Sequence, residues 1–455
     1  MSENRSALDP ALIEWVAETA GGRIVDIDRR PGGGRREAWV VDVETEDGTL
    51  LPLFLRYDRL VPEQRGDPFT LHREAQFYRA FEDSPVPVPR IVGVHPTEQA
   101  ILSERVPGQA WFSRIRDEDE RVSVASDFMR ILAEMHRVDP HRLQLTDRNP
   151  ESGLRQLVAH EIDTWETIYR GAGAKADPLI ELALAWVKQN IPDSDGPVVI
   201  VQGDTGPGNF LFEDGKVTAV LDLELGHLGD PHDDLAWVTT RAVQEPFTDI
   251  HDRFRDYERA SGITVDLDRV RYYRVLAELR IVILGHGGSV HPDPLSEVGN
   301  ALAYGLLHRR LLIEALGDVL DIELTPPEDV DAESTEREWL YDAALEQIRH
   351  IIVPRSEDAF VIQRSKGLAR ILKYLRDADR YADRVSERDL HDLEGVLGTR
   401  PDTVADGTAA LVERHLAGEI PVAGVLNVLF RQIAGRTQQL RSAMGVLADR
   451  HFDAL

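Results

Sequence analysis

The sequence contains no cysteine among its 455 residues, so disulfide bonds, thiolate metal sites and cysteine nucleophiles are all excluded. It also lacks an apolar run of the roughly 20 residues that a membrane-spanning helix needs. Its first residues are polar and show no basic stretch followed by an apolar one, which argues against a secretory signal. These absences favour a cytoplasmic protein.

Positive charge is also scarce. The chain has 52 Lys and Arg against 80 Asp and Glu, which leaves a formal net charge of −28. A surface of this sign repels nucleic acid and anionic membranes, so we expect neither as a partner. The first lysine is Lys175, and any cation needed earlier in the chain must therefore be arginine or histidine.

The pattern of apolar residues predicts an α+β protein of more than one domain. Residues 38–43 and 50–56 read as strands joined by an Asp47-Gly48 hairpin turn. Residues 323–335 are acidic, contain Pro326-Pro327 and read as a linker. The expected segments are a small sheet with one inserted helix (1–106), a mainly helical segment with two short strands (107–322), the linker (323–335) and a helical domain (336–455).

The most informative stretch lies between Val198 and Pro231. Asp204 follows the apolar run "VVIV" within a glycine-rich turn, where a carboxylate can accept a proton from a hydroxyl. Asn209 and Asp222 carry oxygen ligands of the kind that Mg²⁺ binds, and the hairpin "FLFEDGKVTAVL" should bring them together near Asp204. Each residue alone could simply serve a turn. The three together predict a phosphoryl-transfer site.

The stretch "QGDTGPGNFLFEDGKVTAVLDLELGHLGDPHDDLAW" closely resembles the signature of the aminoglycoside phosphotransferase-like superfamily, which includes the choline kinases. The resemblance covers roughly residues 15–320. It implies a bilobal protein-kinase-like fold, with a small antiparallel-sheet lobe and a mainly helical lobe, ahead of a C-terminal all-α domain. By this resemblance Asp204 is the catalytic aspartate, Asn209 and Asp222 are the Mg²⁺ ligands, and Asp230 and Asp234 are structural.

The chain departs from the family pattern at two positions. Gln202 stands where the family usually has histidine, and Leu223 stands where tryptophan is usual. The family histidine holds the loop rather than acting as a base, and glutamine can also donate and accept hydrogen bonds. We therefore expect activity, although Gln202 leaves a pseudokinase as an alternative.

A kinase of this kind needs a cation on the third strand, paired with a helix glutamate, to hold the nucleotide phosphates. Arg56 stands at the expected place and Glu74 is its natural partner on the following helix. The alternative is that Arg56 is a surface charge at a strand end. Arginine at this position resembles the branch of the superfamily whose kinase domains are fused or adjacent to acyl-CoA dehydrogenases.

Two further segments complete the expected nucleotide site. Gly32, Gly33 and Gly34 would form the loop over the phosphates, although many hairpins carry glycines. Glu104 and Val106 belong to the expected hinge between the lobes, where the backbone would meet the adenine.

The segment after residue 336 resembles a helical domain of unknown function that accompanies these kinases. Phe360, Ile371, Leu372 and Leu375 are expected in its core. We expect it to serve docking, either as a homodimer contact or towards an acyl-CoA dehydrogenase-type partner. A lid over the substrate is the alternative.

These observations predict a small-molecule kinase that uses ATP, with GTP as an open alternative, and Mg²⁺. Its acceptor would be a hydroxyl of an organic molecule, with a hydroxyacyl-CoA or another hydroxylated catabolic intermediate favoured. The alternatives are an aminoglycoside O-phosphotransferase and a nucleotide-binding pseudokinase that acts through its helical domain.

Overall fold

The computed structural model describes residues 8–30, 36–59, 68–145, 148–173, 175–290, 292–294 and 296–455. The chain forms two compact units. The first comprises Met1–Val158, Asp193–Val270 and Asp453–Leu455, and the second comprises Ala159–Pro192 and Arg271–Phe452. No helix among the described residues is long and apolar enough to cross a membrane.

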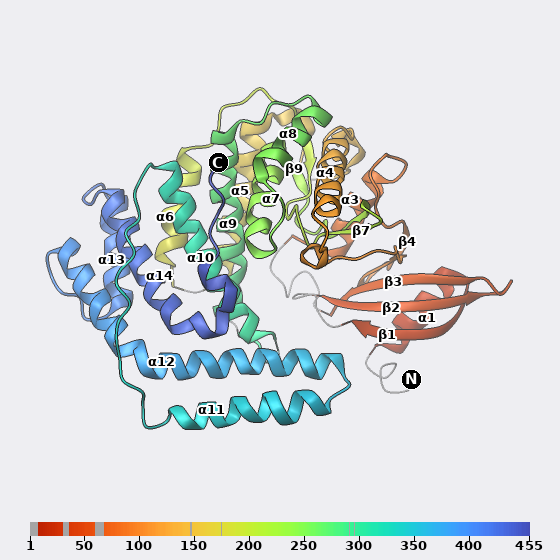
Figure 1. Ribbon diagram of the computed structural model, residues 1–455. Coiled ribbons are helices and arrows are strands. Elements are labelled where there is room, and N and C mark those ends of the chain that lie inside the picture. Colours follow the sequence, from red (N-terminus) through yellow and green to blue (C-terminus); the bar gives the residue numbers. More distant parts are fainter. Residues whose placement is uncertain are drawn as a thin grey trace. The chain divides into compact units, whose positions relative to one another are not determined.

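The first unit contains a five-stranded antiparallel sheet (Figure 1). Its strands lie in the order β1-β2-β3-β5-β4. The bounds are β1 (Gly22–Arg30), β2 (Glu37–Thr45), β3 (Leu50–Asp58), β4 (Ile91–Val94) and β5 (Gln99–Glu104). The sheet and its inserted helix α3 (Leu71–Phe81) confirm the expected N-terminal architecture, but β1 is a strand that the sequence reading had missed.

Helix α1 (Pro10–Ala20) precedes the sheet and is bounded by local signals. The Asp9 side chain accepts a hydrogen bond from the Ala11 backbone N–H, Pro10 occupies the first turn, and Gly21 ends the helix with φ +65°. Its buried face packs on one side of the sheet. The core on that side includes Leu12, Val16, Trp39, Val41, Val43, Leu53 and Leu55.

Alternation along the strands separates this core from a cleft on the other side of the sheet. Leu53 and Leu55 are buried in the core, whereas Phe54 and Arg56 line the cleft. On β2, Ala38 lines the same cleft and pairs with Arg56 across the strands. The period of two thus places Arg56 on the face where a ligand can reach it.

The remainder of the first unit contains two small strand pairs and several helices. Strand β6 (Val199–Val201) pairs with β9 (His227–Gly229), and β7 (Phe210–Glu213) pairs with β8 (Lys216–Val220). The turn between β7 and β8 has positive φ at both Asp214 and Gly215, which confirms the expected tight hairpin. The helices are α4 (Glu118–Met135), α7 (Pro231–Gln244) and α8 (Ile250–Ser261).

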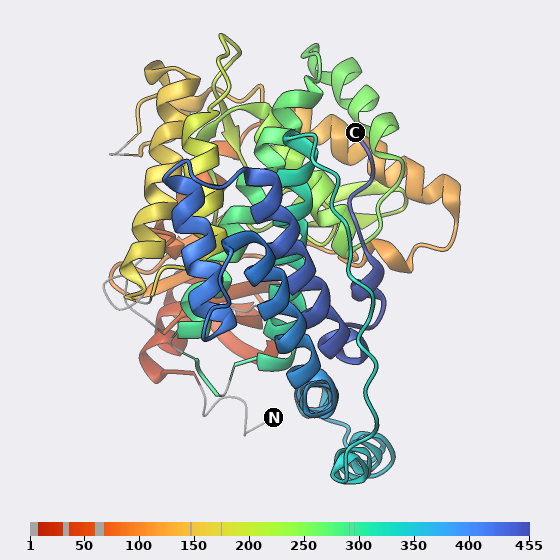
Figure 2. The ribbon, with the colours of Figure 1, turned by 90° about the vertical axis from the view of Figure 1, so that its left-hand side faces the viewer.

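The second unit is helical. Helices α5 (Leu154–Gly171) and α9 (Leu267–Val290) have most of their residues in it. The other helices are α6 (Pro178–Gln189), α10 (Val298–Val319), α11 (Glu338–Gln347), α12 (Ala359–Leu397), α13 (Val404–Leu416) and α14 (Val422–Met444). With the antiparallel sheet of the first unit, these helices confirm the α+β class. Figure 2 shows the packing of α12, α13 and α14 from a second side.

The segment between α10 and α11 has no helix or strand over residues 322–335. Its backbone is held by α14, because the Thr325 N–H donates to Asn427 and the Val330 N–H donates to Gln438. The division into segments 1–106, 107–322, 323–335 and 336–455 stays a prediction.

The prediction that Phe360, Ile371, Leu372 and Leu375 lie in the core of the C-terminal helices is wrong in part. Phe360 and Leu375 are each 44% exposed, and Ile371 and Leu372 are only half-buried. The apolar pattern correctly predicted a helix. Such a pattern does not reveal whether the apolar face of the helix packs against the rest of the same chain or stays exposed.

Candidate active site

Arg56 and Glu74 meet in the cleft. The Arg56 guanidinium donates to one carboxylate oxygen of Glu74, and Glu74 is fully buried. Burial raises the pKa of Glu74, and the charges of Arg56 and Arg36 oppose this rise. Burial lowers the pKa of Arg56, but the negative charges of Glu74 and Asp222 outweigh it and leave that pKa above its ordinary value. The structure thus brings the predicted pair together as an ion pair.

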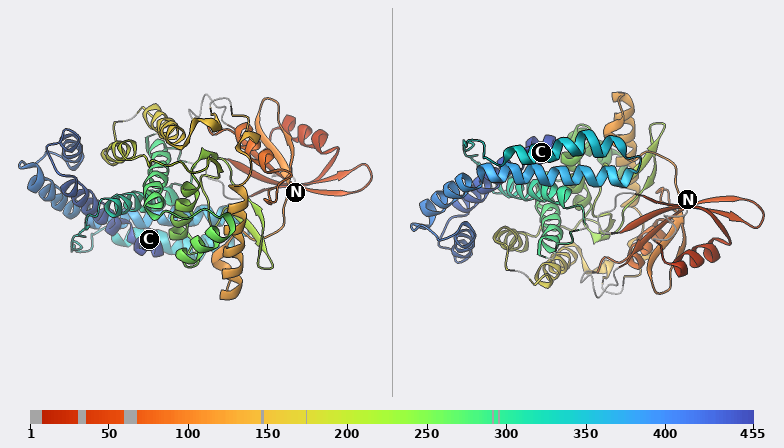
Figure 3. Two further views of the ribbon diagram at one scale, coloured as in Figure 1. Left: turned by 90° about the horizontal axis from the view of Figure 1, so that it is seen from above. Right: turned by 90° about the horizontal axis from the view of Figure 1, so that it is seen from below.

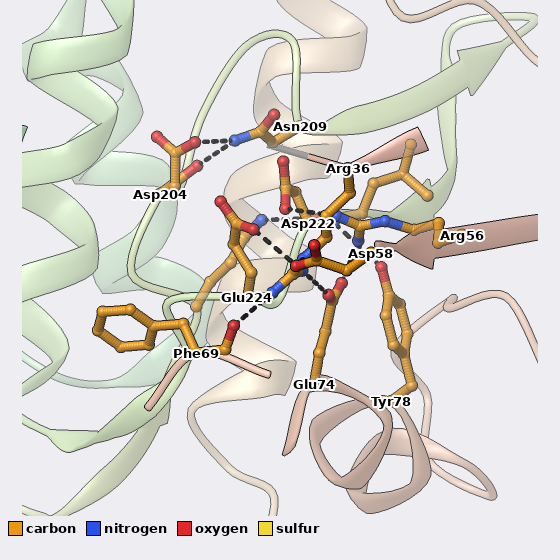
Figure 4. Close-up of polar contacts among 12 residues, drawn as sticks. Arg36, Arg56, Asp58, Phe69, Glu74, Tyr78, Asp204, Asn209, Asp222 and Glu224 are labelled. Atoms are coloured by element: carbon orange, nitrogen blue, oxygen red, sulfur yellow. Dashed lines mark hydrogen bonds and ion pairs between the residues drawn. The ribbon is translucent and has the colours of Figure 1, made fainter. Parts of the chain in front are cut away.

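A second arginine, which the sequence reading missed, binds the other oxygen of Glu74. Nη1 of Arg36 lies 2.5 Å from Glu74 Oε2 and 3.0 Å from a carboxylate oxygen of Glu224 (Figure 4). Its Nη2 donates to the Phe69 carbonyl at 2.6 Å. Arg36 precedes β2 at a position that shares the cleft face with Ala38, and this alternation was the available signal.

Asp222 follows β8 and faces Arg56. The distance between Asp222 Oδ1 and Arg56 Nη2 is 3.6 Å, and the Asp222 backbone N–H donates to the Tyr78 hydroxyl at 3.1 Å. Asp222 has φ +58°, a left-handed conformation that aspartate tolerates better than most residues. Burial and then the charge of Glu224 raise the pKa of Asp222, and Arg56 opposes them.

Asp204 and Asn209 form a second contact pair at the same site. Asn209 Nδ2 donates to the Asp204 carbonyl at 2.7 Å and to Asp204 Oδ2 at 2.6 Å. Because both contacts need a donor, they turn Asn209 Oδ1 away from Asp204. Burial raises the pKa of Asp204 to about 6, against the opposing charge of Arg241 at 3.6 Å. The carboxyl of Asp204 is therefore largely ionised above neutral pH.

The loop that carries Asp204 is anchored by Asp234, which is fully buried. This carboxylate accepts hydrogen bonds from the backbone N–H groups of Gln202 and Gly203, both at 3.0 Å, and from the Thr205 hydroxyl. His136 approaches the same carboxylate at 2.9 Å and is itself buried. Asp234 thus holds the loop that carries Asp204, and His136 contacts this anchoring carboxylate.

Gln202 connects this loop to the segment that carries Asp222. Its side chain is buried, and its Nε2 donates to the carbonyl of Leu221 at 2.7 Å. Leu221 directly precedes Asp222 and also binds the Asn209 carbonyl through its backbone N–H, at 2.9 Å. The glutamine therefore holds the two loops together by a hydrogen bond that the family histidine could also donate.

The donor set fits a divalent cation bound together with phosphate. Asn209 and Asp222 both line the cleft, and Asp222 Oδ1 is buried without any hydrogen-bond partner among the described residues. In that part of the chain, no cluster of three or more His, Cys, Asp or Glu residues is arranged to hold a metal. Mg²⁺ usually takes few protein ligands and fills its coordination sphere with phosphate and water, so two ligands match its needs.

The cleft that these residues share has a volume of about 390 Å³. One part of its wall is apolar and is formed by Phe54, Pro89, Ile91 and Ile101. Ser103 also lines the cleft, but the expected hinge residues Glu104 and Val106 do not and stay a prediction. Gly32, Gly33 and Gly34 lie outside the described residues. An apolar wall beside paired cations and carboxylates suits a nucleotide, with its base on the wall and its phosphates at the charged end.

A strand cation paired with a helix glutamate, facing two oxygen ligands and a loop carboxylate, defines a phosphoryl-transfer enzyme of the kinase-like class. Residues 29–279 match the sequence profile of the phosphotransferase enzyme family. The match covers more than half of the chain, and the chain belongs to this family.

Two longer proteins of known sequence are similar to part of this chain. Acyl-CoA dehydrogenase family member 11 of Rattus norvegicus is 31% identical over 119 residues, which are 26% of this chain and 15% of that protein. Acyl-CoA dehydrogenase family member 10 of Mus musculus is 27% identical over 177 residues, 37% of this chain and 16% of that protein. The matched part is thus a small fraction of these longer relatives.

A crystal structure of a candidate aminoglycoside phosphotransferase from Ralstonia eutropha shares the fold. It is 22% identical, with a TM-score of 0.50, and the match covers 67% of this chain and 95% of that one.

Proposed function

We propose that this chain is an ATP- and Mg²⁺-dependent small-molecule kinase that phosphorylates a hydroxyl group. The observation that carries the proposal is the single cleft in which the Arg56–Glu74 pair faces Asn209 and Asp222, with Asp204 hydrogen-bonded to Asn209. Each part matches one requirement of phosphoryl transfer: a cation for phosphate, oxygen ligands for a metal, and a carboxylate for the acceptor hydroxyl.

In this mechanism Arg56 and Arg36 orient the nucleotide phosphates, and Glu74 holds both guanidinium groups in place. The oxygen of the acceptor hydroxyl bonds to the γ-phosphorus while Asp204 accepts the proton of that hydroxyl. The bond between the γ-phosphorus and the oxygen that bridges it to the β-phosphorus breaks, and ADP leaves. Mg²⁺, held by Asn209 and Asp222, would neutralise charge that develops on the phosphate oxygens. Gln202 positions Asp222 by its hydrogen bond to Leu221.

For the acceptor we favour a hydroxyacyl-CoA or another hydroxylated catabolic intermediate. Support comes from Arg56 in place of the usual lysine and from similarity to two acyl-CoA dehydrogenase family members. The candidate aminoglycoside phosphotransferase of similar fold supports an aminoglycoside as the second candidate. ATP is favoured over GTP only by the usual preference of such enzymes.

The test measures Mg²⁺-dependent turnover of ATP and GTP with a panel of hydroxyacyl-CoAs, simple alcohols and aminoglycosides. One acceptor class should be phosphorylated, and Asp204→Asn should reduce kcat by about 10²- to 10⁴-fold. Asp214→Asn is a matched control, because Asp214 is an exposed turn residue of the neighbouring hairpin and its replacement should leave kcat unchanged. Full activity of Asp204→Asn would exclude the proposed base, and nucleotide binding without any phosphorylated acceptor would favour a pseudokinase.

A further inference from the structure

Exposed apolar side chains are concentrated on one part of the second unit. Eight of the fourteen large apolar side chains that are exposed in the described chain lie between Trp339 and Leu375. This region, here named the α11–α12 hairpin, comprises α11, the π-helical turn Ile348–Ile352 and the first half of α12, residues 359–376 (Figure 3, right). The eight side chains are Trp339, Leu340, Ile351, Ile352, Phe360, Val361, Leu368 and Leu375.

Few side chains of the hairpin are fully buried, although Ile348 of the π-helical turn is buried and most of residues 362–376 are half-buried. Helix α11 has no buried residue, and α12 has only Ser365 buried before Val385. Helices in proteins owe most of their stability to the packing of an apolar face rather than to intrinsic propensity. An exposed apolar surface of this extent therefore indicates a contact with another molecule.

The apolar surface of α12 has the spacing of a helix-packing seam. Val361, Leu368 and Leu375 are seven residues apart and are 40%, 49% and 44% exposed. Side chains at this spacing form one stripe along a helix and pack against a neighbouring helix.

Other sides of α12 are already occupied within the unit. Gln363 contacts Glu297 at 2.5 Å and Gly367 packs closely on Gly299, while Arg376 contacts Asp342 of α11 at 2.9 Å. These contacts use positions of α12 other than Val361, Leu368 and Leu375, which stay 40–49% exposed.

The charges on the hairpin select the kind of partner. Residues 359–376 of α12 contain five Lys or Arg and no Asp or Glu, whereas residues 336–346 around α11 contain four Asp or Glu and one Arg. An anionic membrane would meet the carboxylates of α11, and a uniformly acidic protein partner would meet them too. A surface with one acidic and one basic helix is complementary to a second copy of itself, because a two-fold axis places each α11 beside the partner's α12.

We propose that the α11–α12 hairpin docks against the same hairpin of a second copy of this chain. The two hairpins form a four-helix bundle, in which the Val361, Leu368 and Leu375 seams are buried and α11 of each copy lies beside α12 of the other. Within one hairpin, one such pair already forms between the two helices, Arg376 with Asp342 at 2.9 Å. This inference is independent of the proposed kinase activity.

The first experiment measures the mass of the full chain in solution by light scattering after gel filtration and by sedimentation, over a wide range of concentration at fixed ionic strength. We expect a dimer, and Leu368→Glu should weaken dimerisation by about 100-fold or more, since each copy loses a buried leucine and gains a buried charge. Leu416→Glu is the matched control, because Leu416 on α13 has the same 49% exposure as Leu368.

Two outcomes of this experiment would overturn the proposal. A wild-type chain that is monomeric at every concentration, whether or not it binds anionic vesicles, has no homodimer. A dimer that Leu368→Glu leaves intact uses another surface. Thermal unfolding of each variant is measured in parallel, because Leu368→Glu should change the mass without lowering the Tm of the monomer.

A second experiment tests the charge pairing without touching the seam. Glu336→Lys with Glu346→Lys changes the formal charge of residues 336–346 from −3 to +1, and Arg364→Glu with Lys366→Glu lowers that of residues 359–376 from +5 to +1. The Arg376–Asp342 pair within the hairpin remains. Each double variant alone should dimerise at least about 10-fold more weakly than wild type, and a mixture of the two should form a heterodimer. Unchanged homodimers, or a mixture that stays monomeric, would contradict the docking of α11 on α12.

Discussion

The cleft of the first unit and the α11–α12 hairpin of the second differ in what they leave unpaired. In the cleft, the Glu74 carboxylate is fully buried but has two arginines around it. In the hairpin, the charged side chains are exposed or paired at the surface, and large apolar side chains are exposed to solvent. A buried charge needs partners within the same unit, because desolvation is costly. An exposed apolar stripe can be covered by a second molecule instead. Substitutions in the cleft should therefore lower the stability of the monomer, whereas substitutions on the exposed side of the hairpin should leave it nearly unchanged.

The largest effect is expected at Glu74. Glu74→Gln leaves Arg36 and Arg56 without their shared carboxylate, and should lower the free energy of unfolding by about 3–5 kcal/mol. Chemical denaturation measures this change. The control is Glu44→Gln on the same sheet, whose partner Arg23 is 73% exposed, and it should cost less than about 1 kcal/mol. Equal costs at the two positions would remove the contrast between buried and exposed pairs.

The next effect compares two leucines of α12. Leu393 is fully buried and Leu368 is 49% exposed. Leu393→Ala should lower the free energy of unfolding by about 2–5 kcal/mol, whereas Leu368→Ala should cost less than about 1 kcal/mol at concentrations where the chain is monomeric. If Leu368→Ala were the more damaging in the monomer, its side chain would be covered within its own chain.

A smaller effect is expected at Gly203, beside the candidate base. Gly203 has φ +84°, and a Cβ atom there would lie 2.5 Å from the Leu225 carbonyl oxygen. Gly203→Ala should therefore cost about 1–3 kcal/mol and lower kcat, since the loop that carries Asp204 must shift. Gly48→Ala is the control that measures backbone strain without a steric clash. Gly48 has φ +85°, but a Cβ atom there would have no neighbouring atom within 4 Å. Its cost should be about 1 kcal/mol.

The last effect appears only as a dependence on pH, and it concerns Asp389, a buried carboxyl of α12. Burial raises its pKa to about 6, although its neighbour Arg388 opposes this. The folded protein thus holds this proton more tightly than the unfolded chain, so this group's contribution to stability falls as the pH rises from about 4 to about 6. Asp389→Asn removes the cost of ionisation and should gain up to about 3 kcal/mol of stability over wild type between pH 4 and pH 7, at about 1.4 kcal/mol per pKa unit. Thermal unfolding of the variant and of the wild type at pH 4 and pH 7 measures this gain. The control is Asp402→Asn at an exposed loop position, which should give no gain.

Local sequence signals predicted much of the fold. The Asp47-Gly48 and Asp214-Gly215 dipeptides each join two paired strands, as expected. Asp9, Pro10 and Gly21 mark the two ends of α1. These signals act between residues close in sequence. Strand β1 was missed because its sequence "GRIVDIDRR" carries many charges, and only its pairing with β2 makes it a strand.

The sequence by itself determined the chemistry of the candidate site. Residue type and spacing singled out Asp204, Asn209 and Asp222, and the resemblance to a kinase family added Arg56 and Glu74. The structure places Asn209, Asp222 and Arg56 on one cleft, with Asp204 bonded to Asn209 and Glu74 bonded to Arg56.

Only the tertiary structure decided how these groups are held and charged. Arg36 reaches Glu74 across 38 positions of sequence, and Gln202 reaches Leu221 across 19, so neither contact follows from a local pattern. The pKa of Asp204 rises because packing removes water from it, and the seam of α12 is exposed because no helix among the described residues of the unit covers it. Desolvation and coverage depend on what surrounds a side chain in space, and that is set by the packing of segments far apart in the sequence.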